Sequence, residues 1–296
     1  MTGHGRSYGA ITVINAMPCG IGATIGVDLV TDSVFDVIGD ERKVIIKNDP
    51  SEDDRMARLC VSAAYSRMGI PEPIGWELEI SSQIPVSRGL KSSSSACNSI
   101  LSAIFDEHGF KIGTMDMIRI GVACARSAGV TVTGSFDDAC GCHLGGFVMT
   151  DNAHDRLILH RNVGLHDVVI YVPDEKIRKK GLEVDNLRAC AQIIRDAISI
   201  SETDPFSAMT INGRTIASAS GIDGSWAERA LRYGALGAGV SGSGPAVTAV
   251  FDRGMAKEFI KICGSGCILT TTRDAKVLMR PDTKEGKERC TRQAEE

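Results

Sequence analysis

Residues 84–96 read Ile-Pro-Val-Ser-Arg-Gly-Leu-Lys-Ser-Ser-Ser-Ser-Ala, and they decide how this chain is interpreted. Pro85 fixes its backbone torsion and ends the strand expected at 76–80, while Gly89 permits a tight turn close to a bound anion. The serines then open a helix whose apolar residues recur every three or four positions up to Phe105. Backbone N–H groups at a helix start lack intrahelical partners and carry partial positive charge. This junction therefore predicts a site for a nucleotide phosphate.

The same serines could serve only as helix caps, because Ser is a preferred residue at the start of a helix. One or two hydroxyls would suffice for a cap, however, and four consecutive serines lower helix propensity without a folding benefit. We favour the phosphate interpretation and keep capping as its alternative.

Composition and charge describe an ordinary globular chain. It has 296 residues, 43% hydrophobic and 24% charged, which is enough to bury a substantial core. The net charge of −4 gives no support to nucleic acid or an anionic membrane as the main partner. No apolar run reaches the roughly 18 residues of a membrane span, and residues 1–8 lack a signal-peptide core. We expect a cytoplasmic protein.

Ten cysteines are scattered through the expected helices and strands, which predicts reduced, buried thiols rather than disulfides. The close pairs Cys140 with Cys142 and Cys263 with Cys267 lack the doubled spacing of a zinc site.

Strands and helices are segregated along the chain rather than strictly alternating, which predicts an α+β fold. We expect two lobes, at 1–160 and 161–280, followed by a polar tail at 281–296 that frays. Apart from the serine helix, the expected strands are 11–15, 24–30, 33–38, 43–47, 76–80, 146–149, 156–160, 167–172, 246–251, 267–271 and 276–279. The expected helices are 51–68 (capped by Ser51), 114–128, 185–199, 205–218, 225–233 and 255–263.

A second glycine-rich element, residues 237–245, reads Gly-Ala-Gly-Val-Ser-Gly-Ser-Gly-Pro and runs into the expected strand at 246–251. It matches a dinucleotide-binding fingerprint literally, but that fingerprint needs a strand before it and a helix after it. A plain hairpin is one alternative. We favour a loop whose N–H groups face an anion or the serine helix. No Walker A sequence and no serine-hydrolase elbow occurs.

Two adjacent carboxylates, Asp137 and Asp138, close the stretch 131–138, Thr-Val-Thr-Gly-Ser-Phe-Asp-Asp. They could simply cap a helix. Placed across from bound phosphates, such a carboxylate could instead accept a hydroxyl proton or hold Mg²⁺ during phosphoryl transfer. The N-terminal segment 5–15 adds polar residues that suit either a small-molecule site or a solvated hairpin.

Together these clusters resemble the GHMP kinases, the family of galacto-, homoserine, mevalonate and phosphomevalonate kinases. Residues 85–96 resemble the family's ATP-phosphate motif, with Lys91 where a third small residue is usual, and residues 239–245 resemble its C-terminal motif. Within the family the strongest resemblance is to the archaeal-type shikimate kinases, through residues 12–16, 131–138 and 239–245.

The resemblance implies the two-lobe GHMP kinase fold, with the active site in the cleft between the lobes, and transfer of the ATP γ-phosphoryl group to the 3-hydroxyl of shikimate, a step toward chorismate and the aromatic amino acids. The ATP-binding residues would be Pro85, Arg88, Gly89, Leu90, Lys91, Ser92, Ser93, Ser94, Ser95 and Ala96. Mg²⁺ would rest on Ser94 or Ser95 and Asp138. Weaker candidates for the acceptor side are Arg6, Asn15, Asp28, Ser241, Gly242, Ser243 and Gly244.

The family register assigns catalysis to Asp138, which stands seven residues before Gly145, with Asp137 as the alternative and Lys91 or Arg88 near the developing charge. Some members carry a glutamate Mg²⁺ ligand eleven positions upstream, where this chain has Ser127. Other hypotheses are a homoserine or mevalonate type of acceptor and a ligand sensor without catalysis. An RNA-binding role is disfavoured by the acidic balance.

Overall fold

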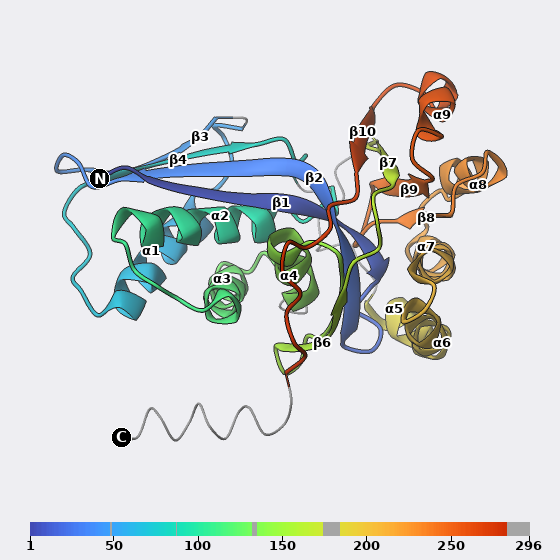
Figure 1. Cartoon of the computed structure of the whole chain (residues 1–296), viewed down its shortest axis with the longest axis horizontal. Coiled ribbons are helices and arrows are strands. Elements are labelled where there is room, and N and C mark those ends of the chain that lie inside the picture. Colours follow the sequence, from blue (N-terminus) through green and yellow to red (C-terminus); the bar gives the residue numbers. More distant parts are fainter. Residues whose placement is uncertain (48, 87, 132–134, 174–183, 283–296) are drawn as a thin grey trace.

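Two β-sheets organise the chain in a computed structural model, which describes residues 1–47, 49–86, 88–131, 135–173 and 184–282 (Figure 1). The first sheet has the order β3-β4-β2-β5-β6, with β1 paired to β2, and the second has the order β10-β7-β9-β8. The strands of the first are β1 (Gly3–Ile14), β2 (Ile21–Asp36), β3 (Arg42–Ile46), β4 (Trp76–Ser82), β5 (Phe147–Asp151) and β6 (Arg156–Arg161). Those of the second are β7 (Asp167–Tyr171), β8 (Gly237–Val240), β9 (Val247–Phe251) and β10 (Cys267–Thr271).

Helices cover one face of the first sheet and flank the second. Those packed under the first sheet are α1 (Arg55–Met68), α2 (Ser92–Glu107), α3 (Thr114–Ser127) and α4 (Phe136–Leu144). Those around the second are α5 (Val184–Ala189), α6 (Ala191–Ser201), α7 (Pro205–Ser220), α8 (Ser225–Arg232) and α9 (Ala256–Ile262). The α+β architecture predicted from the sequence is confirmed.

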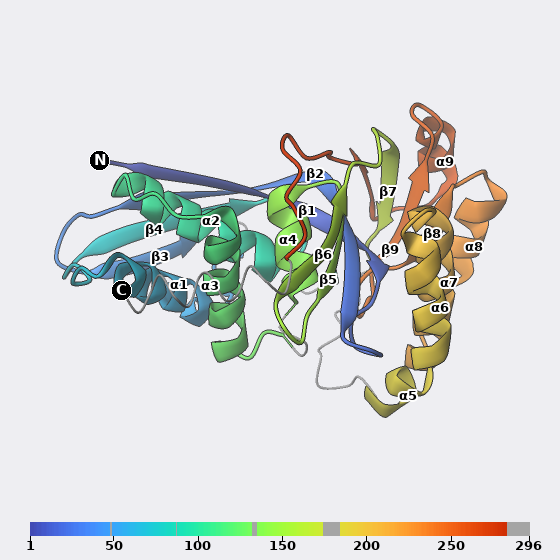
Figure 2. The ribbon, with the colours of Figure 1, turned by 60° about the horizontal axis from the view of Figure 1, so that its bottom comes forward.

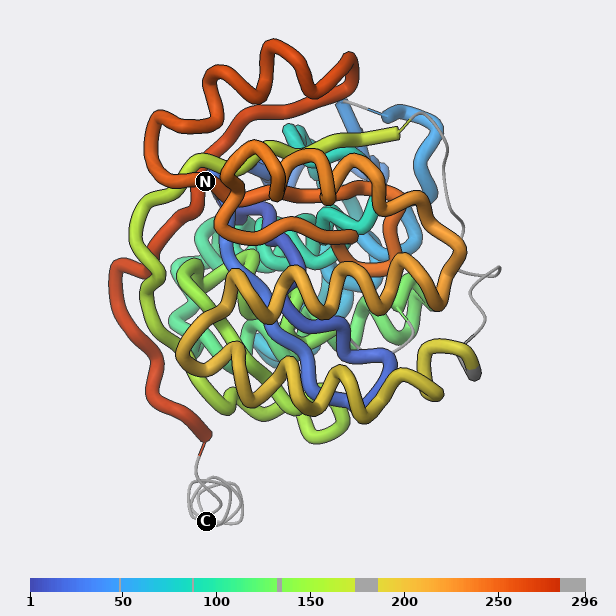
Figure 3. Tube along the Cα trace, turned by 90° about the vertical axis from the view of Figure 1, so that its right-hand side faces the viewer, coloured from blue at the N-terminus to red at the C-terminus, as the bar shows by residue number. Residues whose placement is uncertain are grey.

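The hairpin of β1 and β2 joins the two halves of the molecule. Strand β2 pairs with β4 through residues 31–36 and with β5 through residues 21–25, so it runs the length of the first sheet (Figure 2). Its far end is embedded in a core that combines Ile11 and Ile14 of β1 with Val168 of β7 and Met209 of α7. Helices α6 and α7 lie across this end of the hairpin (Figure 3). The polar residues at the end of β1 are thereby carried to the junction of the two sheets.

Some element boundaries differ from the sequence-based expectation. The strands expected at 24–30 and 33–38 are one strand, because the polar residues between them continue the ladder with β1 and β4. Helix α1 begins at Arg55 after Asp54, not after Ser51. The helix expected at 185–199 is interrupted at Cys190, and residues 237–240 form strand β8 rather than loop.

The prediction of a strand at 276–279 is also wrong, because these residues form no strand. The N–H of Met279 donates to His160 Nδ1, and the N–H of Ala275, just before this segment, donates to Asn162 Oδ1, so neither donates to another strand. The predicted division of the chain after residue 160 falls inside β6, one residue before that strand ends at Arg161. The tail beyond 282 and residues 132–134 of the aspartate stretch lie outside the described residues.

The described cysteines are all free thiols, as expected from their scattering. Within the described ranges, no helix combines the length and apolar character needed to cross a membrane.

Candidate active site

The serine-rich junction forms the start of helix α2. Lys91, and not a serine, is the residue before the helix; it lies in the left-handed region, with φ of 68°, and its side chain makes no capping hydrogen bond. Ser92 and Ser93 are half-buried, whereas Ser94 and Ser95 are buried. Because the serine hydroxyls do not act as caps, the N–H groups of the first turn are available for an anion.

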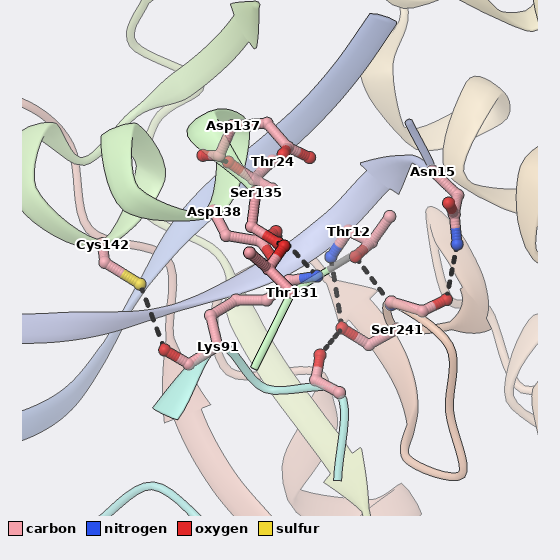
Figure 4. Close-up of polar contacts among 12 residues, drawn as sticks. Thr12, Asn15, Thr24, Lys91, Thr131, Ser135, Asp137, Asp138, Cys142 and Ser241 are labelled. Atoms are coloured by element: carbon pink, nitrogen blue, oxygen red, sulfur yellow. Dashed lines mark hydrogen bonds and ion pairs between the residues drawn. The ribbon is translucent and has the colours of Figure 1, made fainter. Parts of the chain in front are cut away.

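A buried ion pair joins this junction to helix α4. The Lys91 ammonium lies 2.9 Å from Asp138 Oδ1, and the two side chains are only 6% and 17% exposed (Figure 4). Burial lowers the pKa of Lys91, but the nearby Asp138 and Asp137 carboxylates outweigh it, so the net pKa is raised and the ammonium stays charged. Sequence positions 47 residues apart thus meet as one charged pair.

Asp137 has different partners from its neighbour. Its Oδ1 accepts a hydrogen bond of 2.7 Å from Asn152 Nδ2, its own N–H donates to Asn152 Oδ1, and Thr24 donates to its carbonyl. Gly22 makes room for the carboxylate, since a Cβ there would stand 2.3 Å from Asp137 Oδ2. Burial, and then the charge of Asp138, raise the pKa of Asp137 to about 7. Neither aspartate is the N-cap residue of α4. That position belongs to Ser135, whose side chain makes no capping hydrogen bond, while both aspartates lie in the first turn.

The glycine-rich stretch closes against the phosphate junction from the second sheet. Ser241 Oγ donates to Gly89 O at 2.9 Å and accepts from the N–H of Thr12 at 3.3 Å. The Gly242 N–H donates to Thr12 Oγ1, and Asn15 Nδ2 donates to Gly242 O. Gly89 has φ of +80°, and a Cβ on it would lie 2.1 Å from Ser241 O, so only glycine fits this contact. The loop therefore lies against the phosphate junction, but through the Ser241 hydroxyl, whereas the Gly242 N–H donates to Thr12 of β1 and not to the serine helix.

The structure brings together most of the residues selected from the sequence, but not Arg6 and Asp28. Alternation along β1 places Arg6 on the exposed side of the strand, where it pairs with Asp32. Asp28 lies exposed at a bulge between β1 and β2. Arg88 donates through Nη1 to the carbonyl of Pro173, just after β7.

Leu90 is buried in the core shared by the two sheets, and Pro85 is half-buried before the junction. Ser243 is half-buried and Gly244 is buried, and the Gly244 N–H donates to Ser241 O within the loop.

Three residues at the site were not selected from the sequence: Thr12, Thr24 and Asn152. Thr12 carried a usable signal, because it is a polar residue inside the apolar run of β1. Asn152 carried none, since an asparagine after a strand is ordinary turn chemistry. Only the packing of α4 onto β5 places it against Asp137.

Metal ligands are sparse around this site. Among the described residues, no group of three or more His, Cys, Asp or Glu side chains could hold a metal ion. Ser127, the position where some relatives of this pattern carry a glutamate, ends α3 and lines an open cavity of about 660 Å³ between α1 and α3.

Known proteins match both the fold and the sequence. The family model described as the GHMP kinases N terminal domain matches residues 55–146, and the one described as GHMP kinases C terminal matches residues 215–267. The crystal structure of the mevalonate kinase of Methanococcus jannaschii superposes with a TM-score of 0.75 over 93% of this chain and 98% of that chain, at 16% identity. A homoserine kinase from Cytophaga hutchinsonii gives 0.69 at 19% identity, over 93% and 97%. The class of protein is thus an ATP-dependent small-molecule kinase.

Relatives in sequence make the assignment more particular. A shikimate kinase from Pyrococcus abyssi is 35% identical over 277 residues, covering 92% of this chain and 99% of that protein. A shikimate kinase from Methanothrix thermoacetophila is 37% identical over 253 residues, covering 85% and 86%. The chain belongs to the GHMP kinase family, beside these archaeal shikimate kinases.

Proposed function

We propose that the chain transfers the γ-phosphoryl group of ATP to the 3-hydroxyl of shikimate, giving shikimate 3-phosphate and ADP on the route to chorismate. The observation that carries the proposal is the buried pair of Lys91 and Asp138 at the start of the phosphate-binding helix. The choice of acceptor rests on the relatives named as shikimate kinases, which match this chain over most of its length.

In this proposal the helix start holds the phosphates. Backbone N–H groups between Gly89 and Ser95 bind the triphosphate, favoured by the positive end of α2. The clamp from Ser241 to Gly89 fixes the shape of that turn before ATP binds. Positioning and charge stabilisation are the main contributions a protein makes to phosphoryl transfer.

Asp138 then orients the acceptor hydroxyl and takes its proton as the oxygen attacks the γ-phosphorus. Lys91 lies beside this carboxylate and stabilises the negative charge that spreads over the transferring group. Asn15 and the loop from Ser241 to Gly244 border the same junction, so we place the acceptor between them and Asp138.

Mg²⁺ fits the residues present. It prefers oxygen ligands, keeps several waters and needs only one or two carboxylates besides the phosphates. Asp138 supplies a carboxylate, and the buried Ser95 Oγ has no hydrogen-bond partner among the described residues. Ser94 or Ser95 together with Asp138 would therefore hold the ion, which would neutralise phosphate charge. Ser127 supplies no carboxylate, so the set is smaller than in members with a glutamate.

The acceptor is tested by measuring ADP release with shikimate, homoserine, mevalonate and galactose as a panel. We expect turnover with shikimate and a product phosphorylated at its 3-hydroxyl by NMR. Turnover with one of the other three but not with shikimate would overturn the acceptor and leave the kinase mechanism standing. Binding of ATP and shikimate without ADP release would indicate a sensor.

The role of Asp138 is tested against its neighbour. Asp138→Asn should lower kcat by about 10²–10⁴, the contribution of a positioned proton acceptor. Asp137→Asn should keep kcat within about tenfold, because Asp137 bonds to Asn152 and not to Lys91. Steady-state kinetics with saturating ATP measures both, and the reverse ranking would move the catalytic role to Asp137.

A further inference from the structure

The C-terminal end of helix α4 is held by an arginine from outside the first sheet. The last carbonyls of a helix lack intrahelical partners. Here Arg273 Nη2 donates to Cys142 O at 3.3 Å and to His143 O at 3.2 Å, and Ser7 Oγ also donates to Cys142 O. A cation at this end also complements the helix dipole.

Arg273 belongs to the segment 272–282 that follows β10, which we call the strap. The red strap runs beside α4 in Figures 1 and 2. Its backbone is fixed at the crossing point, because the Arg273 N–H donates to Gly26 O at 2.9 Å and Gly146 donates to Arg273 O at 2.7 Å. The segment that follows the last strand of the second sheet thereby contacts a helix that packs on the first sheet.

The environment of Arg273 is costly for a charge. Its side chain is half-buried, lies 3.9 Å from the centre of the Tyr8 ring and bonds to uncharged carbonyls; no described carboxylate forms an ion pair with it. Burial lowers the pKa of Arg273. A partly buried cation whose hydrogen bonds go to the last carbonyls of one helix is suited to holding that helix end in place.

Cys142 connects the arginine to the reactive pair. Its carbonyl accepts from Arg273, while its Sγ donates to Lys91 O at 3.8 Å. Asp138 precedes Cys142 by four residues, or about 6 Å along the helix axis. A shift of the C-terminal end of this short helix would therefore displace Asp138 along the helix and Lys91 through its contact with Cys142.

We propose that Arg273 is a positioning residue for phosphoryl transfer, which sets the place of Asp138 and Lys91 by holding the C-terminal end of α4. The proposal rests on the role proposed above for Asp138. It makes the alignment of the site depend on one side chain of the strap, which contributes no group to the phosphate junction.

The test compares Arg273→Ala and Arg273→Lys with a matched control in the strap. Asp274→Ala is that control, because Asp274 binds the N–H groups of Val163 and Gly164 and so anchors the strap away from α4. For each variant of the full chain, kcat and KM for ATP are measured with whichever acceptor the panel assay selects, together with thermal stability. Activity is then repeated with added guanidinium ion.

We expect Arg273→Ala to lower kcat by about tenfold or more, since small misplacements of reacting groups have effects of this size or larger. For Arg273→Ala, KM for ATP should stay within about twofold of the wild-type value, and added guanidinium should restore part of the lost kcat. The kcat of Arg273→Lys should lie between that of the wild type and that of Arg273→Ala. Asp274→Ala should keep kcat within about twofold and show no rescue.

Equal losses of kcat in Arg273→Ala and Asp274→Ala, or a rise in KM for ATP with unchanged kcat, would overturn the proposal. If Arg273→Ala does not fold, Arg273→Lys decides: a fall in kcat without a rise in KM supports positioning, and wild-type kcat excludes it. Asp138→Asn is measured alongside. If it keeps full activity, the role of Asp138 fails whatever Arg273 does.

Discussion

Two ion pairs of this molecule have nearly the same chemistry and opposite surroundings. Lys91 and Asp138 meet at 2.9 Å where both side chains are mostly buried. Arg6 and Asp32 meet at 2.6 Å across neighbouring strands, with 59% and 45% of their side chains exposed. Contact distance therefore does not distinguish the two pairs, and burial does.

The difference favours the buried pair as the one that takes part in the proposed reaction. Removing two charges from water is expensive, and their mutual attraction often fails to repay the cost, so a buried pair is weak evidence for a role in stability. A water-excluded pair beside a phosphate-binding helix start is, however, well suited to a reaction in which charge moves. The exposed pair is screened by solvent and contributes little.

Breaking the buried pair should have the largest effect. Lys91→Met keeps much of the straight side chain but removes the ammonium from Asp138. We expect kcat to fall by about 10²–10³, the usual cost of deleting one preorganised group that stabilises transition-state charge. Steady-state ADP release at saturating ATP measures it, and a kcat within about threefold of the wild type would show that the pair is only structural.

A smaller effect should come from titrating the buried group beside the pair. The pKa of Asp137 is raised to about 7 from 3.8, so between these values the folded chain holds a proton that the unfolded chain has released. The free energy of unfolding should then fall as pH rises from about 4 to 7, and Asp137→Asn should remove this slope. The expected difference from the wild type is at most about 1.4 kcal/mol per pH unit.

The other end of α4 provides an internal control with the opposite sign. Burial lowers the pKa of His143 to about 4 from 6.5, so between these values the unfolded chain holds the extra proton. His143 therefore makes the free energy of unfolding rise over about pH 4 to 6.5, so in the wild type it partly cancels the fall that Asp137 causes. Urea unfolding across this range should give a more positive slope for Asp137→Asn and a more negative one for His143→Gln. Parallel curves for all three proteins would contradict both assignments.

Breaking the exposed pair should have the smallest effect. Arg6→Ala removes a solvent-screened contact on the outer side of β1, so the free energy of unfolding should change by no more than about 0.5 kcal/mol. Because Arg6 lies apart from the site, kcat and KM for shikimate should match the wild type. A large rise in KM for shikimate would instead place Arg6 at the acceptor carboxylate.

The sequence predicted much of the fold, because periodic apolar residues and glycine or proline breaks are local signals. Helix α2 was expected from apolar residues spaced every three or four positions up to Phe105, and it ends at Glu107 with His108 as its cap. The pairing of strands that lie far apart in the sequence was harder to predict. The polar residues between 30 and 33 look like a turn, yet they continue β2 because strands on both sides supply hydrogen-bond partners.

The strap at 272–282 illustrates the same limit. A strand was expected at 276–279, but the N–H groups of Ala275 and Met279 donate to Asn162 and His160, which lie more than 100 positions earlier in the chain. No local pattern could report these partners, nor could it report that Asn152 holds Asp137.

By itself the sequence determined the kind of chemistry: a glycine turn and serines at a helix start, two adjacent aspartates, and a second glycine loop. These are properties of neighbouring residues, and backbone conformation and residue type suffice to infer them. Only the tertiary structure decided that Asp138 faces Lys91 while Asp137 faces Asn152, and that Arg6 and Asp28 stand aside. The physical reason is that burial and charge pairing depend on which distant segments pack together, and packing belongs to the whole chain.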